Sequence, residues 1–233
     1  MHEPPSKLEV IRSSSLLNGL TDEQIEELAV VSRPAHAERA ELIWLDGSSV
    51  TFFGIVASGF VKMTRTTAAG QEVTTEIMGP GQIFGLLGVV DGTGCPQTAK
   101  AVCDTWYLKV PKASIMPIYN TNVVLKEHLV RRTTNRLRQS YDMISHLSSG
   151  KVDQRIAAVL LMLANSYGVG KDSGVVISVP LTRQDIAEIA GTTVESTIRV
   201  MSKWQKSGLV TTKSKMILLK DKDALVSTVR GST

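Results

Sequence analysis

Residues 181–207 constrain the fold of this chain more than any other stretch, because they have the pattern of two short helices joined at a glycine. Thr182 precedes the first predicted helix and Thr193 the second, and threonine is a preferred helix N-cap. Gly191 stands between the helices, at the position of a tight turn. The pattern predicts a helix-turn-helix, whose second helix can enter the major groove of DNA.

The second predicted helix, residues 193–207, has one apolar side at about 3.6 residues per turn. The spacing i, i+3, i+4 and i+7 places Thr197, Val200, Met201 and Trp204 on this side. We therefore expect these four residues to face the core and the charged residues between them to face away from it.

The charged side of this helix suits base recognition. An arginine can donate to both major-groove acceptors of guanine, and a carboxylate can accept from the amino group of cytosine. Glu195 and Arg199 lie one turn apart, so we expect the carboxylate also to steer the guanidinium. Thr192, Thr193 and the free N–H groups of the helix start can bind a backbone phosphate. An amphipathic helix with a merely solvated face is the alternative.

A hairpin is predicted at residues 209–220, with Lys213 and Lys215 at its tip. A hairpin after a recognition helix is a wing, and its lysines would lie near phosphates, although a solvated turn is the alternative for each of them. The residues that we expect to contact DNA are Arg183, Gln184, Thr192, Thr193, Val194, Glu195, Ser196, Ile198, Arg199, Lys203, Lys213 and Lys215.

The run T-R-Q-D-I-A, followed by G-T-T-V-E-S-T-I-R-V, resembles the helix-turn-helix of the cyclic-AMP receptor protein/FNR (CRP/FNR) family of bacterial transcription regulators. Val194, Glu195 and Arg199 match the FNR branch, whereas Ile198 stands where that branch usually has serine and can instead pack on a thymine methyl. The resemblance implies a homodimer that binds double-stranded DNA at a near-palindromic site and has RNA polymerase as a partner.

The resemblance spans about residues 15–220 and implies an α+β fold. Alternating strand-like segments with regularly spaced glycines between residues 37 and 110 independently indicate a roll of antiparallel strands. We expect a β-roll sensor domain of the jelly-roll, cyclic-nucleotide-binding-like type with N-terminal helices at 1–116. A dimerisation helix with a hinge follows at 117–149, and a winged helix-turn-helix at 150–233.

The β-roll lacks the charges with which the family's cyclic-nucleotide binders hold the ribose and the phosphate. Their glutamate position is Leu86 here, and their arginine position is Gln97. A buried phosphate would be poorly paired without them, so we do not expect cyclic AMP as the effector. The pocket, for something smaller or less charged, is expected to be lined by Phe84, Gly85, Leu86, Gln97 and Thr98. A filled roll without a ligand is the alternative.

No cofactor is predicted. An FNR-type iron–sulfur cluster needs four thiolates, and the chain has only Cys95 and Cys103. Cys95, in a glycine-rich loop, is a candidate for an exposed, oxidisable thiol, and Cys103 is expected to be a small buried residue on a strand. Haem would need His36 or His128 as its axial ligand, and an isolated histidine is more often a surface or packed residue. The roll contains no histidine cluster of the kind that a cupin-type metalloenzyme would need.

A long helix is predicted from Pro117 to Leu147, followed by a hinge at residues 148–150. Apolar residues recur along it every seven positions, with a tyrosine at the offset of four, which is typical of a coiled-coil seam with a second subunit. A single helix packed within one chain is the alternative. The expected seam residues are Val123, Val130, Leu137, Tyr141 and Ile144.

The composition agrees with a DNA-binding regulator without requiring one. The 233 residues carry a net charge of +4, which is mildly basic. No apolar run is long enough for a membrane span and the N-terminus does not look like a signal peptide, so we expect a cytoplasmic protein. We predict a sequence-specific regulator that is not an enzyme, controlled by a signal other than cyclic AMP or constitutively active. The alternatives are an effector-binding β-roll with a vestigial DNA domain, and an enzyme that uses the roll.

Overall fold

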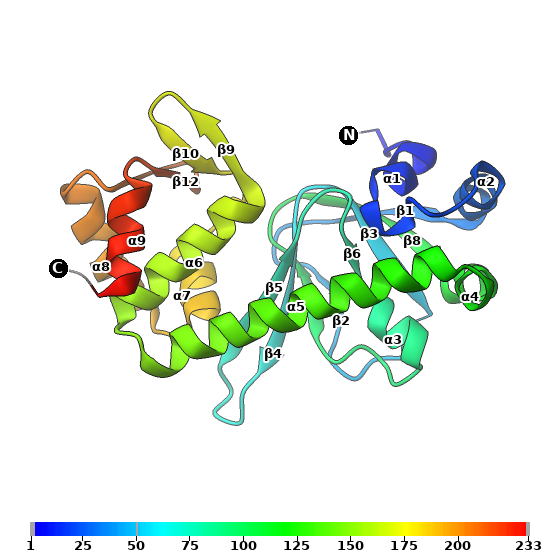
Figure 1. Ribbon diagram of the computed structural model, residues 1–233, viewed down its shortest axis with the longest axis horizontal. Helices are drawn as coiled ribbons and strands as arrows, with labels where there is room; N and C mark the ends of the chain where they lie inside the picture. The colour runs from blue at the N-terminus through cyan, green and yellow to red at the C-terminus, as the bar shows by residue number, and fades with distance from the viewer. Residues whose placement is uncertain (1–2, 50, 232–233) are drawn as a thin grey trace. The chain divides into compact units, whose positions relative to one another are not determined.

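The computed structural model describes residues 3–49 and 51–231, and all of their side chains except those at 146–149. The chain divides into two compact units. One contains residues 1–65 and 75–137, and the other contains residues 66–74 and 138–233. Figure 1 labels the helices and strands of both.

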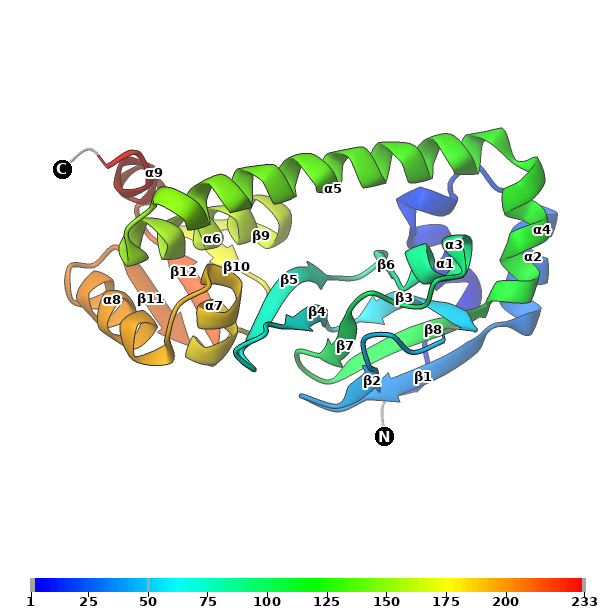
Figure 2. The same ribbon diagram turned by 90° about the horizontal axis from the view of Figure 1, so that it is seen from below.

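The first unit is built on two antiparallel sheets of four strands each. Figure 2 shows β1, β8 and β3 of one sheet side by side. This confirms the predicted β-roll. In spatial order the strands of this sheet are β1 (Arg33–Ala37), β8 (Thr105–Pro111), β3 (Phe52–Ser58) and β6 (Ile83–Phe84). Those of the other sheet are β2 (Leu42–Trp44), β7 (Thr98–Ala101), β4 (Val61–Thr66) and β5 (Glu72–Met78).

The core of the roll follows from the alternation of side chains along its strands. Phe53 and Ile55 of β3 pair with Val110 and Leu108 of β8, and all four side chains are fully buried. Gly54 stands between Phe53 and Ile55 and lies directly against the ring of Phe84. A Cβ at this position would overlap that ring. The glycine thus lets an aromatic ring close the inside of the roll.

Helices precede and follow the strands of the roll, and one short helix, α3, lies between two of these strands in the sequence. The second helix, α2, begins with a reciprocal capping box between Thr21 and Gln24. The helices are α1 (Lys7–Ser13), the short 3-10 turn η1 (Ser15–Leu17), α2 (Asp22–Val31), α3 (Leu86–Asp91), α4 (Lys112–Thr121) and α5 (Val123–Ser149).

The predicted single helix from Pro117 to Leu147 is wrong at both ends. Asn122 interrupts it, because its extended backbone ends α4 and its side chain accepts from the N–H of Leu125 at 2.9 Å to start α5. At the other end α5 continues through residues 148 and 149, which we expected in the hinge. Only Gly150 and Lys151 remain between α5 and the next helix.

The second unit is a winged helix-turn-helix, as predicted. Its strands form one antiparallel sheet in the order β11, β12, β10, β9. Two elements were not predicted, β9 and the C-terminal helix α9. The elements are α6 (Val152–Tyr167), β9 (Gly168–Lys171), β10 (Gly174–Ile177), α7 (Arg183–Ala190), α8 (Val194–Lys206), β11 (Val210–Lys213), β12 (Met216–Leu219) and α9 (Lys222–Arg230).

The core of this unit lies between α6 and the other helices. Ile156 and Leu160 of α6 are fully buried, as are Ile186 of α7, Met201 of α8 and Leu225 of α9. Ile156 and Leu160 are four residues apart, so α6 buries one of its faces at helical spacing. Within the described part of the chain, no helix combines the length and apolar character needed to cross a bilayer.

Candidate nucleic-acid interface and effector pocket

The helix α7 has its predicted cap at one end and its predicted glycine at the other. Thr182 caps α7, since its hydroxyl accepts from the N–H of Asp185 at 3.1 Å and the Asp185 carboxylate accepts from the N–H of Thr182 at 2.9 Å. Gly191 ends α7 with a positive φ of 57°. This left-handed conformation favours glycine and redirects the chain into α8.

The helix α8 has the predicted core side. Thr193 caps it by accepting from the N–H of Ser196 at 3.2 Å. Thr197, Met201 and Trp204 are buried, and Val200 is half-buried. The opposite side of α8 is consequently free of core contacts and presents its side chains outward.

Most residues of α8 that we expected to contact DNA are solvent-accessible. Thr193, Glu195, Ile198, Arg199 and Lys203 are exposed. Thr192, Val194 and Ser196 are half-buried at the start of the helix. The structure therefore places a carboxylate, a guanidinium and a large apolar side chain on one accessible face.

The expected steering of Arg199 by Glu195 is wrong. Hydrogen bonds from its own backbone N–H and from the hydroxyl of Thr193 hold the pKa of Glu195 below its usual range. Arg199 instead donates to the hydroxyl oxygen of Ser196 at 3.5 Å. A carboxylate is favoured at the positive end of a helix, so the first turn of α8 competes successfully for Glu195. The hydrogen bonds to the Glu195 carboxylate use its own backbone N–H and the hydroxyl of Thr193, two donors that we expected to bind a phosphate.

Two expected contact residues on α7 have partners within this unit. Arg183 is half-buried and donates from Nη2 to the hydroxyl oxygen of Thr212 on β11 at 3.1 Å, and its burial lowers its pKa. Gln184 is exposed and donates to a carboxylate oxygen of Glu188 at 2.9 Å. Arg183 thus ties the first helix of the pair to the wing.

Sequence reasoning missed one residue that holds the turn. Arg155 on α6 donates from Nη1 to the backbone carbonyl of Gly191 at 3.0 Å. A guanidinium at the carbonyl end of α7 also interacts favourably with the helix dipole. Nothing in the sequence links these positions, because they are 36 residues apart and only the packing of α6 on α7 brings them together.

The wing is a tight hairpin whose two loop residues are uncommon in such a turn. Lys213 of β11 pairs with Met216 of β12, so Ser214 and Lys215 alone form the loop. Both have positive φ, 49° and 66°, in a conformation that usually selects Asn or Gly. Lys213 and Lys215 are exposed, so the predicted position of both lysines at an accessible tip is confirmed.

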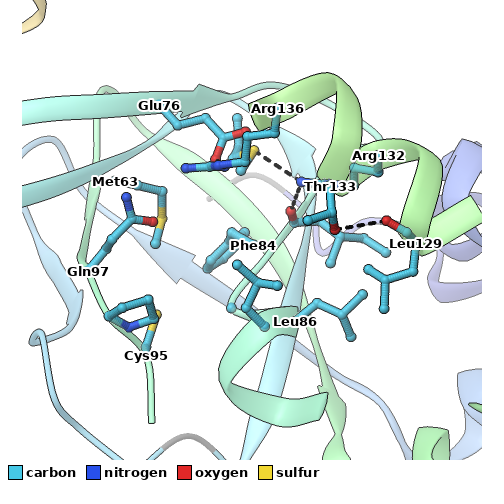
Figure 3. Close-up of a pocket in the computed structure, with 15 residues that line it drawn as sticks. Met63, Glu76, Phe84, Leu86, Cys95, Gln97, Leu129, Arg132, Thr133 and Arg136 are labelled. Atoms are coloured by element: carbon cyan, nitrogen blue, oxygen red, sulfur yellow. Dashed lines mark hydrogen bonds and ion pairs between the residues drawn. The ribbon is translucent and has the colours of Figure 1, made fainter. Parts of the chain in front are cut away.

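The β-roll contains a cavity of about 50 Å³ at the predicted place (Figure 3). Phe84, Gly85, Leu86 and Gln97 line it, as expected, whereas Thr98 does not. Thr98 is buried on β7, where its hydroxyl accepts from the N–H of Asp46 at 3.0 Å. Ligand pockets in proteins are typically about 300–1,000 Å³, so the cavity as it stands is too small for a nucleotide.

The charged residues of this cavity were not predicted to line it. Glu76 of β5 forms an ion pair with Arg136 of α5, and Arg132 donates to the backbone carbonyl of Ile83. Figure 3 shows Glu76 and Arg136 side by side at one end of the cavity. Burial lowers the pKa of Arg136. One sequence signal was available for the two arginines. Arg132 and Arg136 are four residues apart on one helix, so they lie on the same side of it.

The expected exposure of Cys95 is wrong. Its side chain is only 2% exposed, and burial raises the pKa of the thiol. The loop that carries Cys95 packs against the turn that follows β2, where the N–H of Cys95 donates to the carbonyl of Ser48 at 3.2 Å. Cys103 is half-buried in the bend between β7 and β8, so its expected place on a strand is also wrong.

The two histidines considered as haem ligands lie in unrelated contacts. His36 packs against Trp106, with ring centroids 5.0 Å apart. His128 Nδ1 lies 3.3 Å from the carbonyl oxygen of Leu16. Among the residues that the structure describes, no three histidine, cysteine, aspartate or glutamate side chains gather in the manner of a metal site.

Two protein-family models match this chain, one over the β-roll and one over the winged helix-turn-helix. Residues 34–122 match the cyclic nucleotide-binding domain, and residues 154–228 match the Crp-like helix-turn-helix domain. Together they cover the strands of the roll, the helix pair and the wing, but not the residues of α5 that line the cavity.

The similar proteins match this chain over most of their length, and the first of them is named as a transcriptional regulator. The CRP-like cAMP-activated global transcriptional regulator of Mycobacterium tuberculosis is 23% identical, covering 95% of this chain and 99% of that protein. The fumarate and nitrate reduction regulatory protein of Salmonella typhi is 24% identical, covering 89% and 83%. FixK2 from Bradyrhizobium japonicum has the same fold, with a TM-score of 0.75 at 21% identity over 85% of this chain and 97% of that one.

Proposed function

The chain is a DNA-binding transcription regulator of the CRP/FNR family, and we propose that it reads a near-palindromic site as a homodimer through α8. The observation that carries this proposal is the accessible face of α8, where Glu195, Ile198 and Arg199 are exposed while the opposite face is buried. Arginine on such a face suits guanine, and exposed lysines on the wing suit phosphates.

Homodimer formation is supported by the surface of α5. Its five seam residues are large or aromatic apolar side chains, and each is about half exposed or more. An apolar stripe that repeats every seven residues on an exposed helix is the geometry of a coiled-coil contact. Two linked copies would present two copies of α8 to the two halves of one site. The seam residues are Val123, Val130, Leu137, Tyr141 and Ile144.

The proposal is tested by removing one charge from α8. A duplex is first selected from a randomised pool with the full-length protein, and its affinity is measured by fluorescence anisotropy. We expect Arg199→Ala to weaken binding to this duplex by about 1–3 kcal/mol, because a bidentate contact to guanine is lost.

The matched control is Arg230→Ala, which removes an arginine that is also exposed, at the end of α9. We expect it to bind the selected duplex nearly as the unmodified protein does. Equal effects of the two substitutions would contradict base reading by Arg199. Failure of the pool to enrich any duplex would favour the alternative of an effector-binding roll with a vestigial DNA domain.

We also propose that the regulating signal is not cyclic AMP, or that the protein is constitutively active. The family's charged positions are Leu86 and Gln97, and the side chain of Gln97 donates to the hydroxyl of Thr75. The arginine that reaches the cavity from α5, Arg136, is already paired with Glu76. Such a cavity supports a small ligand or none.

The remaining partners follow from this function. A regulator that acts at bacterial promoters works in the cytoplasm, where the chromosome is, and with RNA polymerase as a partner. We propose both for this chain because similar bacterial proteins are named as a transcriptional regulator and a regulatory protein. The same names support a regulatory rather than an enzymatic role.

A further inference from the structure

We propose that Ile198 reads the methyl group at C5 of a pyrimidine in the major groove, so that each half-site carries a thymine beside the base read by Arg199. At sites that carry cytosine here instead of thymine, we expect 5-methylcytosine to be preferred to cytosine, so that methylation would strengthen binding to those sites. It rests on the proposed function, since it requires α8 to lie in the major groove.

The first support is the exposure of Ile198. Its side chain is 49% exposed, although it is large, apolar and surrounded on this face by polar and charged residues. Its neighbour one turn earlier, Val194, is half-buried, so the two side chains form a short apolar edge along α8. Because isoleucine is β-branched, few rotamers are lost when this edge is covered.

The second support is the chemistry of the groove. Base edges in the major groove present hydrogen-bond donors and acceptors, and the C5-methyl of thymine is the apolar exception. Ile198 has no polar atom in its side chain, so contact with a donor or acceptor would leave that group unpaired. A methyl group at C5 is therefore the feature that this side chain complements, and 5-methylcytosine carries it at the same ring position as thymine.

The third support is the position of Ile198 between two polar readers. Glu195 precedes it by three residues and Arg199 follows it directly, and both are exposed on the same face. The Glu195 carboxylate accepts from Thr193 at the start of the helix, and Ile198 keeps about half of its surface exposed. The apolar side chain is thus accessible next to the guanidinium that we expect to bind guanine.

The size of the effect follows from the area of one methyl group. Burial of one methyl or methylene is worth about a fourfold change in an equilibrium constant. We expect replacement of the contacted thymine by uracil, which removes only the methyl, to weaken binding about fourfold per half-site and about sixteenfold when both half-sites are changed.

The experiment uses the full-length protein and the duplex selected from a randomised pool. Each thymine of the half-site is replaced in turn by uracil, and the affinities are compared by anisotropy. At the sensitive position, duplexes with a cytosine–guanine pair are compared with and without methylation at C5. We expect one position to show the fourfold loss with uracil and a gain of similar size with 5-methylcytosine over cytosine.

Protein variants assign this sensitivity to Ile198. Ile198→Ala should lose the discrimination between thymine and uracil, whereas Ile198→Val should keep most of it. Val169→Ala is the matched control, because Val169 is also exposed, at 54%, but lies on β9 outside the helix pair. It should leave the discrimination unchanged.

Two sets of results would overturn the inference in different ways. If the selected duplex binds with dependence on Arg199 but uracil equals thymine at every position, methyl reading is wrong and the proposed function stands. Methyl reading by Ile198 is also wrong if Ile198→Ala keeps the discrimination. If no duplex is enriched, or Arg199→Ala has no effect, the proposed function fails and the inference fails with it. The comparison of thymine with uracil uses unmodified protein, so it does not depend on the folding of a variant.

Discussion

At the scale of single residues, Tyr107 on β8 links the core of the roll to pH. The residue is only 4% exposed, and burial raises the pKa of its hydroxyl to about 12, with a smaller contribution from the negative charge of Glu41. In the unfolded chain the hydroxyl ionises near pH 10. Between about pH 10 and 12 the unfolded state therefore loses its proton first, and the folded state loses stability as the pH rises.

We expect Tyr107→Phe to flatten this dependence. A difference of about two pKa units corresponds to a stability on the order of 2 kcal/mol that is present below pH 10 and lost by pH 12. Urea unfolding of both proteins at a series of pH values measures the two slopes. Parallel curves between pH 10 and 12 would show that Tyr107 ionises in the folded protein as it does in the unfolded chain.

Single residues also show where prediction from sequence stops. The caps at Thr182 and Thr193 were predicted, because their partners lie three residues away. The burial of Cys95 was not, because it depends on a turn almost 50 residues earlier in the chain. The ion pair between Glu76 and Arg136 in the cavity was not predicted for the same reason, since a β-strand and a distant helix contribute one group each.

At the scale of elements, the boundaries were predicted less well than the elements themselves. Periodicity predicted α7, α8 and the wing because each buries one face. It did not separate α4 from α5, because no glycine or proline marks the break, which depends on the side chain of Asn122. The side chain of Asn122 caps α5 and also donates to the carbonyl of Gly19 at 3.0 Å, a contact that no local pattern contains.

The wing provides a prediction that separates charge from backbone conformation. Lys215 has a positive φ of 66°, which costs a non-glycine residue roughly 1–2 kcal/mol. Lys215→Gly should therefore stabilise the protein, by about 0.5–1 kcal/mol after the greater flexibility of glycine in the unfolded chain is subtracted. The same substitution removes one positive charge and should lower the salt slope of DNA binding by about one.

The control for this prediction is Lys213→Gly. It removes the same charge from the same hairpin, but at a strand position where glycine weakens the structure. We expect it to lower the salt slope similarly and to destabilise the protein, as measured by thermal unfolding. If both glycine variants were destabilised equally, the positive φ of Lys215 would carry no strain.

At the scale of the whole molecule, the apolar stripe along α5 predicts the oligomeric state. Val130 and Leu137 are 66% and 49% exposed in the single chain and lie one seven-residue repeat apart. We expect the protein to sediment as a dimer at micromolar concentration. Leu137→Glu should shift it to a monomer, because each dimer would bury two unpaired carboxylates at a cost of several kcal/mol.

Asn135→Glu is the matched control for the dimer. It introduces the same charge at an exposed position of α5 that the seven-residue repeat places away from the stripe. We expect it to remain a dimer and to keep its affinity for the selected duplex, whereas Leu137→Glu should lose affinity because its two half-sites would be bound independently. A monomer in the unmodified protein, or a dimer that tolerates Leu137→Glu, would mean that the stripe on α5 is not the contact between subunits. Because α8 itself is unchanged in both variants, the comparison separates the contribution of pairing from that of base reading.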